Sequence, residues 1–341
     1  MSRDRLLIFG VALLGVLGIL AYKQVKRDEA IGRPFTGAGS ADFPTISAPE
    51  DITKISITNG DKGEIVLEQV TDSSAPPTDA GPATTWVLTK PVRADANQQS
   101  VKDLIGNLKD LKVSSQVNLR LDDDTRKEKQ LDAAHALHVV AWKGADKKVD
   151  ELFGKSGAAG QLMTLADKPD VVWAAKGYSS YLYTKEPKDF RNKEIFHFDD
   201  ANALQVAITN SHGTFSFAKT GDKWAGTRGN KPIVRFDPEK VKDMLRSYKS
   251  LNADDFGDGK SLSETGLDQP EAQLELHLNN DSKVYQLSIG KVSAGTNRWA
   301  KRADSDTIYQ LANYASEWLT SDVSKYQSPA DAGADSGAKT K

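Results

Sequence analysis

The sequence predicts an α+β fold in which one unit occurs twice in tandem. Each unit is expected to hold an antiparallel or mixed sheet covered by one or two helices, and one N-terminal transmembrane helix is expected before the first unit. Three observations in the 341-residue chain predict this architecture. Strand-like segments recur in the same order in both halves, an amphipathic helical pattern follows the third strand of each half, and strands come in runs instead of alternating with helices.

The opening strands of the two halves match each other. ITKISITN at Ile52–Asn59 corresponds to ALQVAITN at Ala203–Asn210, and both alternate apolar and polar residues as a half-buried strand does. A second strand follows in each half, and then a segment with a tryptophan, Trp86 or Trp224, where we expect a third strand. The second strands are GEIVLEQ at Gly63–Gln69 and GTFSFAK at Gly213–Lys219.

A helix is predicted after the third strand of each half, because apolar residues there recur at i, i+3, i+4, i+7 and i+10 and so share one helical face. Asp237 followed by Pro238 is a favourable N-cap and first-turn pair, and either Asp95 or Asn97 could cap the first helix. The two stripes are Val101, Leu104, Ile105, Leu108 and Leu111, and Val241, Met244, Leu245, Tyr248 and Leu251.

The second part of each half repeats as well. Leu131–Lys155 aligns with Leu267–Lys291, and both segments contain an alternating strand, a polar turn, a second strand and a closing Gly-Lys pair. Two further strands and a short aromatic helix are expected at Val171–Tyr183 and Thr307–Leu319. The stretch DFRNKEIFHFDD at Asp189–Asp200 is then a junction, at which one unit ends and the next begins almost without a linker.

These patterns give five segments. We predict an N-terminal membrane anchor at 1–27, a flexible tether at 28–49, a first α+β repeat at 50–193, a second α+β repeat at 194–327 and a disordered tail at 328–341.

The anchor is the unbroken apolar run at Leu6–Tyr22, with Arg3 and Arg5 before it and Lys23 after it. As a helix the run would be ~25 Å long, close to the ~30 Å hydrocarbon core of a bilayer. A cleaved signal peptide is the alternative, but its small-x-small cleavage pattern is absent around Ile19–Lys23. Charges on both sides leave the positive-inside rule undecided, and a short N-terminal tail usually stays cytoplasmic. We therefore expect a single-pass protein of the bacterial inner membrane with the bulk of the chain in the periplasm.

Composition excludes several classes of function. The formal net charge of -2 provides no basic field for nucleic acid. The absence of cysteine excludes a disulfide framework, a thiolate zinc site and a cysteine nucleophile.

Two Gly-Lys-Ser motifs resemble the end of a phosphate-binding loop. That loop also needs a glycine five residues before the Gly-Lys pair, where Val149 and Asp254 stand instead. We therefore interpret both motifs as turns. They are Gly154-Lys155-Ser156 and Gly259-Lys260-Ser261.

No metal site is predicted. His135 and His138 are three residues apart, which places them on opposite faces of the strand expected there. The acidic clusters at Asp122–Asp124 and at Asp254, Asp255 and Asp258 lack the spacing of a calcium loop and are interpreted as solvated loops. We assign no catalytic, cofactor-binding or metal-binding residues, and no cofactor.

Aromatic residues at helical spacing give a weak signal for a sugar or peptide platform. An aromatic stripe on a helix more often packs in the core, so the platform is the less favoured reading. The residues are Tyr178, Tyr181 and Leu182 in the first half and Tyr314, Glu317 and Trp318 in the second.

Together these features resemble the bacterial family called domain of unknown function 4340. The resemblance spans Pro49 to Gln327 in two copies, and rests on the order of several weak motifs. They are DITKISIT, a Trp-containing strand followed by Lys-Pro, the helix VKDLIGNLKDL, the start of a strand at Leu267, Asp268 and Pro270, and FRNKEIFHFD. The resemblance implies a membrane-anchored extracytoplasmic protein, often encoded beside ABC-type transport components of the gliding-motility kind, and it implies no catalytic residues.

We therefore expect a non-enzymatic accessory or scaffold protein of an ABC-type envelope transport complex. Its partners would be the membrane, through Leu6–Tyr22, and an ABC transporter permease or other envelope proteins, with no nucleic acid. Two alternatives stay open, a carboxylate-dependent envelope hydrolase and a cell-wall glycan-binding module. A small-molecule ligand is neither predicted nor excluded.

Overall fold

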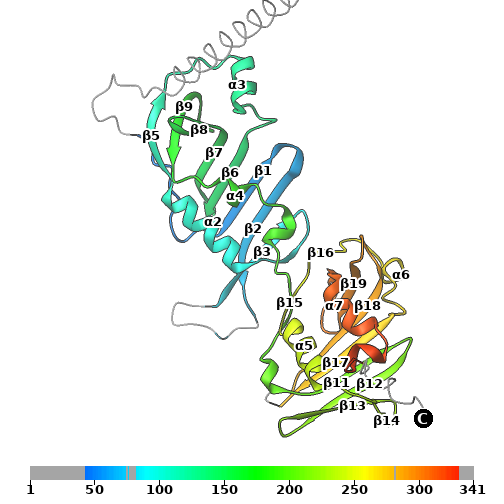
Figure 1. Ribbon diagram of the computed structural model, residues 1–341. Coiled ribbons are helices and arrows are strands. Elements are labelled where there is room, and N and C mark those ends of the chain that lie inside the picture. The colour runs from blue at the N-terminus through cyan, green and yellow to red at the C-terminus, as the bar shows by residue number, and fades with distance from the viewer. Residues whose placement is uncertain (1–42, 74–75, 77–81, 280–281, 330–341) are drawn as a thin grey trace, which may run out of the picture. The chain divides into compact units, whose positions relative to one another are not determined.

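The computed structural model describes residues 43–73, 76, 82–279 and 282–329, which form two separate units (Figure 1). The boundary lies between Asn192 and Lys193, one residue before the boundary expected from the sequence. The predicted anchor, Leu6–Tyr22, falls outside the described residues. No helix within the described part of the chain is both long enough and apolar enough to cross a membrane.

The first unit is built on one antiparallel sheet. Within its described residues nine strands lie side by side in the order β4-β3-β2-β1-β6-β7-β8-β9-β5. The strands are β1 Lys54–Asn59, β2 Gly63–Thr71, β3 Thr84–Lys90, β4 Ala94–Asp95, β5 Lys112–Val117, β6 Leu137–Lys143, β7 Asp146–Gly157, β8 Gly160–Leu165 and β9 Lys168–Lys176. The helices are η1 Gly60–Lys62, α2 Gln98–Asp110, α3 Asp123–Lys129, α4 Ser180–Tyr183 and η2 Pro187–Phe190.

The second unit has the same strand order, β14-β13-β12-β11-β17-β18-β19-β20-β16, together with a small pair β10-β15. Its strands are β10 Glu194–His197, β11 Ala203–Asn210, β12 Gly213–Thr220, β13 Lys223–Arg228, β14 Lys231–Pro232, β15 Ser250–Asn252, β16 Asp255–Phe256, β17 Ala272–Leu278, β18 Val284–Val292, β19 Arg298–Arg302 and β20 Ile308–Leu311. The helices are η3 Asp200–Asn202, α5 Pro238–Tyr248, α6 Leu262–Thr265, α7 Asn313–Thr320 and η4 Val323–Tyr326.

The prediction of sheets with few helices is confirmed. Both nine-stranded sheets are antiparallel throughout their described pairings, so the mixed-sheet alternative is wrong. The strands pair mostly as consecutive hairpins, for which antiparallel pairing is the direct geometry because a two-residue turn suffices.

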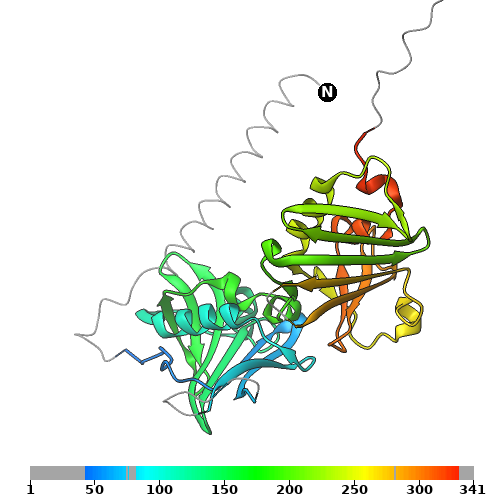
Figure 2. The ribbon, with the colours of Figure 1, turned by 90° about the horizontal axis from the view of Figure 1, so that it is seen from below.

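Each core lies between one face of the sheet and the long helix. In the first unit Ile55 and Ile57 of β1 point to the face on which Leu104 and Leu108 of α2 pack, and all four are buried. Figure 2 shows α2 lying along that sheet. Ile46 and Ala48, which the sequence placed in the tether, are buried in the same core. In the second unit α5 contributes Val241, Met244, Leu245 and Tyr248 to the core.

The C-terminal segment of each unit crosses back to the start of its long helix. In the first unit Asn97 N donates to Phe190 O at 2.8 Å, and Asn192 N donates to Asp95 O at 2.8 Å. The second unit repeats both bonds, from Asp237 N to Tyr326 O and from Ser328 N to Arg235 O, each at 2.9 Å. In each unit the last residues therefore hydrogen-bond to the segment that leads into the long helix.

Asn97 is the N-cap of α2, because its side chain accepts a hydrogen bond from Ser100 N at 2.9 Å. Replacing Asn97 with alanine is expected to lower the free energy of unfolding of the first unit by about 1 kcal/mol, since one terminal N–H loses its acceptor. Urea-induced unfolding of the full chain measures the change. Asp95→Ala is the control, because Asp95 was the other candidate cap. An equal loss in both variants would contradict the assignment.

Candidate protein-contact surfaces

His135 and His138, which the sequence placed together on one strand, lie in different elements and each pairs with a carboxylate. His135 stands in a turn, where its ring Nδ1 is 2.7 Å from an Asp132 carboxylate oxygen. His138 lies on β6 with Nε2 2.7 Å from Asp150 Oδ1. The described residues hold no group of three or more His, Asp or Glu that could bind a metal ion.

The acidic clusters serve local structure. Asp122 caps α3 by accepting a hydrogen bond from Thr125 N at 2.8 Å. Hydrogen bonding by the Thr125 side chain, followed by that of its backbone N–H, lowers the pKa of the Asp122 carboxyl group. Asp254 Oδ2 accepts a hydrogen bond from Asn297 Nδ2 at 2.9 Å. The prediction that Asp122–Asp124 belong to a solvated loop is wrong for Asp123 and Asp124, because α3 begins at Asp123.

The two Gly-Lys-Ser motifs occupy different structures. Gly154 lies inside β7, not in the turn that we predicted, and a Cβ there would collide with the carbonyl oxygen of Lys129. Gly290 holds the equivalent place in β18, against the carbonyl oxygen of Thr265. Gly259 does lie in a turn, with φ of 73°, and Ser261 caps the four-residue helix α6. The glycine that occurs at both equivalent positions, 154 and 290, therefore permits a close approach of a neighbouring backbone.

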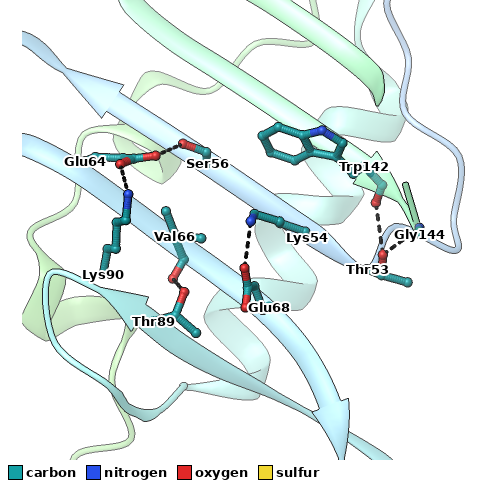
Figure 3. Close-up of polar contacts among 10 residues, drawn as sticks. All are labelled: Thr53, Lys54, Ser56, Glu64, Val66, Glu68, Thr89, Lys90, Trp142 and Gly144. Carbon is teal, nitrogen blue, oxygen red and sulfur yellow. Dashed lines mark hydrogen bonds and ion pairs between the residues drawn. The ribbon is translucent and has the colours of Figure 1, made fainter. Parts of the chain in front are cut away.

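The outer face of the first sheet, opposite the core, carries a ladder of charged side chains (Figure 3). Lys54 Nζ lies 2.8 Å from Glu68 Oε1 across β1 and β2, and 5.5 Å from the ring centroid of Trp142. Lys90 Nζ lies 2.7 Å from Glu64 Oε2. The hydrogen bond from Lys90 holds the pKa of Glu64 below its ordinary value.

Two apolar residues of this face are buried as well. Val66 and Val140 point outward, on either side of Ser56, yet are only 3% and 7% exposed. Ser56 is also buried and donates from its hydroxyl to Glu64 Oε1 at 2.9 Å. The charged groups on the outer face of the first sheet are thus paired within their own unit.

The same face of the second sheet is built from different residues. On β11 and β12 the register places small or neutral residues at the outward positions that hold Lys54, Glu64 and Glu68 in the first sheet. Its ion pair lies instead on β17, where His277 Nε2 is 2.7 Å from Glu275 Oε1. A shallow groove of about 220 Å³ runs over this face, lined mainly by side chains of β11, β17 and β18. The replacements are Gln205 and Ala218 for Lys54 and Glu68, Ala207 and Ser216 for Ser56 and Val66, and Thr209 and Thr214 for Thr58 and Glu64. Two units with one fold therefore present different outer faces.

The aromatic helices contribute less surface than a platform would need. Tyr181 and Tyr314 are exposed, at 65% and 60%. Tyr178 instead stacks between Phe153 and Tyr183, with ring centroids 4.5 and 4.9 Å away. Each helix therefore offers one exposed ring, and the other aromatic residues pack inward.

Glu151 is a buried carboxylic acid that sequence reasoning missed. It is 1% exposed on the core face of β7, and its Oε2 makes no hydrogen bond with any described residue. Burial, followed by the nearby charge of Asp150, raises its pKa to about 8. The signal was present in the sequence, because Glu151 lies between Val149 and Phe153 in a strand whose alternate residues face the core.

An open cavity of about 660 Å³ lies where the C-terminal segment of the second unit meets α7. Its charges nearly balance. Lys325 Nζ is 2.8 Å from Glu317 Oε1 and 4.7 Å from the ring centroid of Trp318, so this cation is already paired. The lining includes Arg235, Lys240, Glu317, Ser321, Asp322 and Lys325.

A family model described as "Domain of unknown function (DUF4340)" matches residues 86–270 and 258–330 of the chain. The two matches overlap, and together they span both units from Trp86 onward. The family that the sequence motifs indicated is therefore the family whose model matches, although the match starts later than Pro49. Comparison with curated proteins and with solved structures gave no match.

Proposed function

The chain belongs to the DUF4340 family, a domain of unknown function, and on that premise we propose that it is a non-enzymatic accessory or scaffold protein of an ABC-type envelope transport complex. In this proposal the run Leu6–Tyr22 anchors it in the bacterial inner membrane as a single-pass protein. The two units stand in the periplasm and act through protein–protein contacts. The family resemblance supports the location, because members look like membrane-anchored proteins encoded beside ABC-type transport components.

The observation that carries the proposal is the difference between two units of the same topology. A tandem duplication accounts for the shared strand order. After such an event, shared catalytic residues would be retained at equivalent positions, whereas contact surfaces are free to diverge. Here β1, β2 and β3 of the first sheet present the pairs Lys54–Glu68 and Lys90–Glu64 outward, while β11 and β12 of the second present small or neutral residues. The second sheet has its ion pair on β17, between Glu275 and His277. Divergent surfaces on one fold support binding to different partner regions.

Co-purification tests the proposal. A C-terminally tagged full-length chain, extracted from native membranes in mild detergent, is expected to bring down ABC permease and ATPase subunits in fixed ratio, identified by mass spectrometry. The control keeps the units and replaces Leu6–Tyr22 with an unrelated single-pass helix. Because the contacts are assigned to the units, the control should retain the partners. Recovery of the chain alone from both preparations would refute the proposal.

A further inference from the structure

The sheet edge at Trp86 in the first unit is closed by a side chain. Trp86 N donates to Gln98 Oε1, and Gln98 Nε2 donates to Trp86 O, both at 2.9 Å. Ala96 N also donates to Trp86 O, at 3.1 Å. The carboxamide of Gln98, at the start of α2, thus supplies the donor and the acceptor that a neighbouring strand residue would supply. Such capping prevents an exposed edge from pairing with another chain.

The described residues provide no such cap for the same edge in the second unit. Trp224 pairs with Lys219 as Trp86 pairs with Gln69, so the two tryptophans hold equivalent places in their sheets. Gly226 O accepts from Ile233 N at 3.0 Å, which shows that Gly226 directs its backbone groups away from β12. Trp224, two residues earlier, directs its N–H and C=O the same way.

Two changes in the chain leave this edge open. α5 begins with Pro238 where α2 begins with Gln98, and proline has no carboxamide. The edge strand β14 also pairs only with Thr227 and Arg228, the residues of β13 nearest the β13–β14 turn. It therefore does not extend alongside Trp224. Among the described residues, none forms a hydrogen bond with the outward N–H or C=O of Trp224.

A pocket of about 400 Å³ adjoins this open edge. Trp224 and Leu245 provide its apolar part, and the cations around it are engaged. Lys242 Nζ is 2.7 Å from Glu239 Oε1, and Lys219 Nζ donates to Ala201 O at 3.0 Å. The lining has three basic side chains and three acidic ones, so it favours an uncharged occupant. The basic ones are Lys219, Lys242 and Arg246, and the acidic ones are Asp200, Asp222 and Glu239.

We propose that the edge of β13 at Trp224 binds an extended, uncharged polar segment of a partner polypeptide. The segment's backbone N–H and C=O make the two hydrogen bonds that the Gln98 carboxamide makes in the first unit, and its neighbouring side chain enters the pocket. This is strand addition, in which backbone bonds give affinity and a pocket for a side chain gives specificity. The inference rests on the proposed function and names the contact site on the second unit.

Hydrogen–deuterium exchange at single-residue resolution tests the inference on the full-length chain. In the isolated chain the amide of Trp224 is expected to exchange at least tenfold faster than that of Trp86. Gln98→Ala is the matched variant, because alanine preserves the helix and removes the carboxamide, which bonds to Trp86 and also donates to Ala96 O at 2.9 Å. In this variant the Trp86 amide should accelerate to a rate near that of Trp224. An unchanged Trp86 rate would overturn the premise that the carboxamide closes the edge.

The decisive comparison uses the complex that co-purifies from native membranes. The Trp224 amide is expected to slow at least tenfold in the complex, with Trp86 unchanged. A complex in which Trp224 exchanges as fast as in the isolated chain would overturn this inference and leave the proposed function standing. Slow exchange at Trp224 in the isolated monomer, or slowing that rises with its concentration through self-association, would also overturn it. Failure to recover any complex refutes the proposed function and this inference with it.

Discussion

Replacing Glu151 with glutamine is expected to abolish most of the loss of stability that the first unit undergoes as the pH rises from about 4.5 to about 8. Burial raises the pKa of Glu151 to about 8 in the folded unit, against an ordinary value of 4.5. The unfolded chain therefore releases this proton at lower pH than the folded chain. The free energy of unfolding should fall across the interval and level off above it, by up to roughly 5 kcal/mol at 1.36 kcal/mol per pKa unit.

The measurement is hydrogen exchange of peptides from β6 and β7 in the full chain at a series of pH values, because these peptides report on the first unit alone. Glutamine has the shape of the protonated acid and does not ionise, so Glu151→Gln should exceed the wild type in stability at pH 8 and match it near pH 4. Glu64→Gln is the control of opposite sign, since the pKa of Glu64 is lowered by Lys90. Equal pH profiles for wild type and Glu151→Gln would contradict the expectation.

Gly154→Ala and Gly290→Ala are each expected to destabilise their own unit by about 2–3 kcal/mol. A Cβ at position 154 would overlap the carbonyl oxygen of Lys129 and lie 2.8 Å from Leu131 Cδ2. At position 290 the obstacle is the carbonyl oxygen of Thr265. Backbone oxygens cannot move aside as flexible side chains do, so the strand and its neighbour must separate.

Gly106→Ala provides the matched control for these two variants. Gly106 lies inside α2, and a Cβ there would meet no heavy atom within 4 Å. Alanine should therefore stabilise the first unit by up to about 1 kcal/mol through helix propensity. Urea unfolding of the three variants, followed by exchange in peptides of each unit, separates the effects. A loss of similar size at all three glycines would mean that close backbone approach is not the cause.

Local sequence patterns predicted the strands and helices themselves better than they predicted which strands pair in the sheet. The alternation in β1 and β11 and the apolar stripes of α2 and α5 are local signals, because each reflects one element with one buried face. Pairing partners are not local. Nothing in the periodicity of Lys112–Val117 indicates that β5 lies beside β9 at the far edge of the sheet. The short helix α3 was missed because its seven residues are mostly charged and carry no apolar stripe.

The same distinction applies to the candidate site. Glu151 was detectable, because its position in an alternating strand already placed an acid on the core face. The Gln98 cap was not detectable, because a side-chain carboxamide that bonds to the backbone of Trp86 leaves no trace in hydrophobic periodicity. The lack of a carboxamide at Pro238 has a structural meaning only because Trp224 and Trp86 hold equivalent places in their sheets.

The strand order also bears on the kinetics of folding. Most neighbouring strands of each sheet are consecutive in the chain and can associate rapidly as hairpins. The central pair of strands in each sheet is different, because its two members are far apart in the chain. β1 can pair with β6 only after β6 is present, so that Lys54 aligns with Trp142, and β11 likewise waits for β17. Closing such long loops is slow, since chain entropy is lost before the contacts form. During synthesis each nascent half therefore exposes one unpaired edge of its central strand until the later strands emerge, and this interval is when the protein is most prone to aggregate.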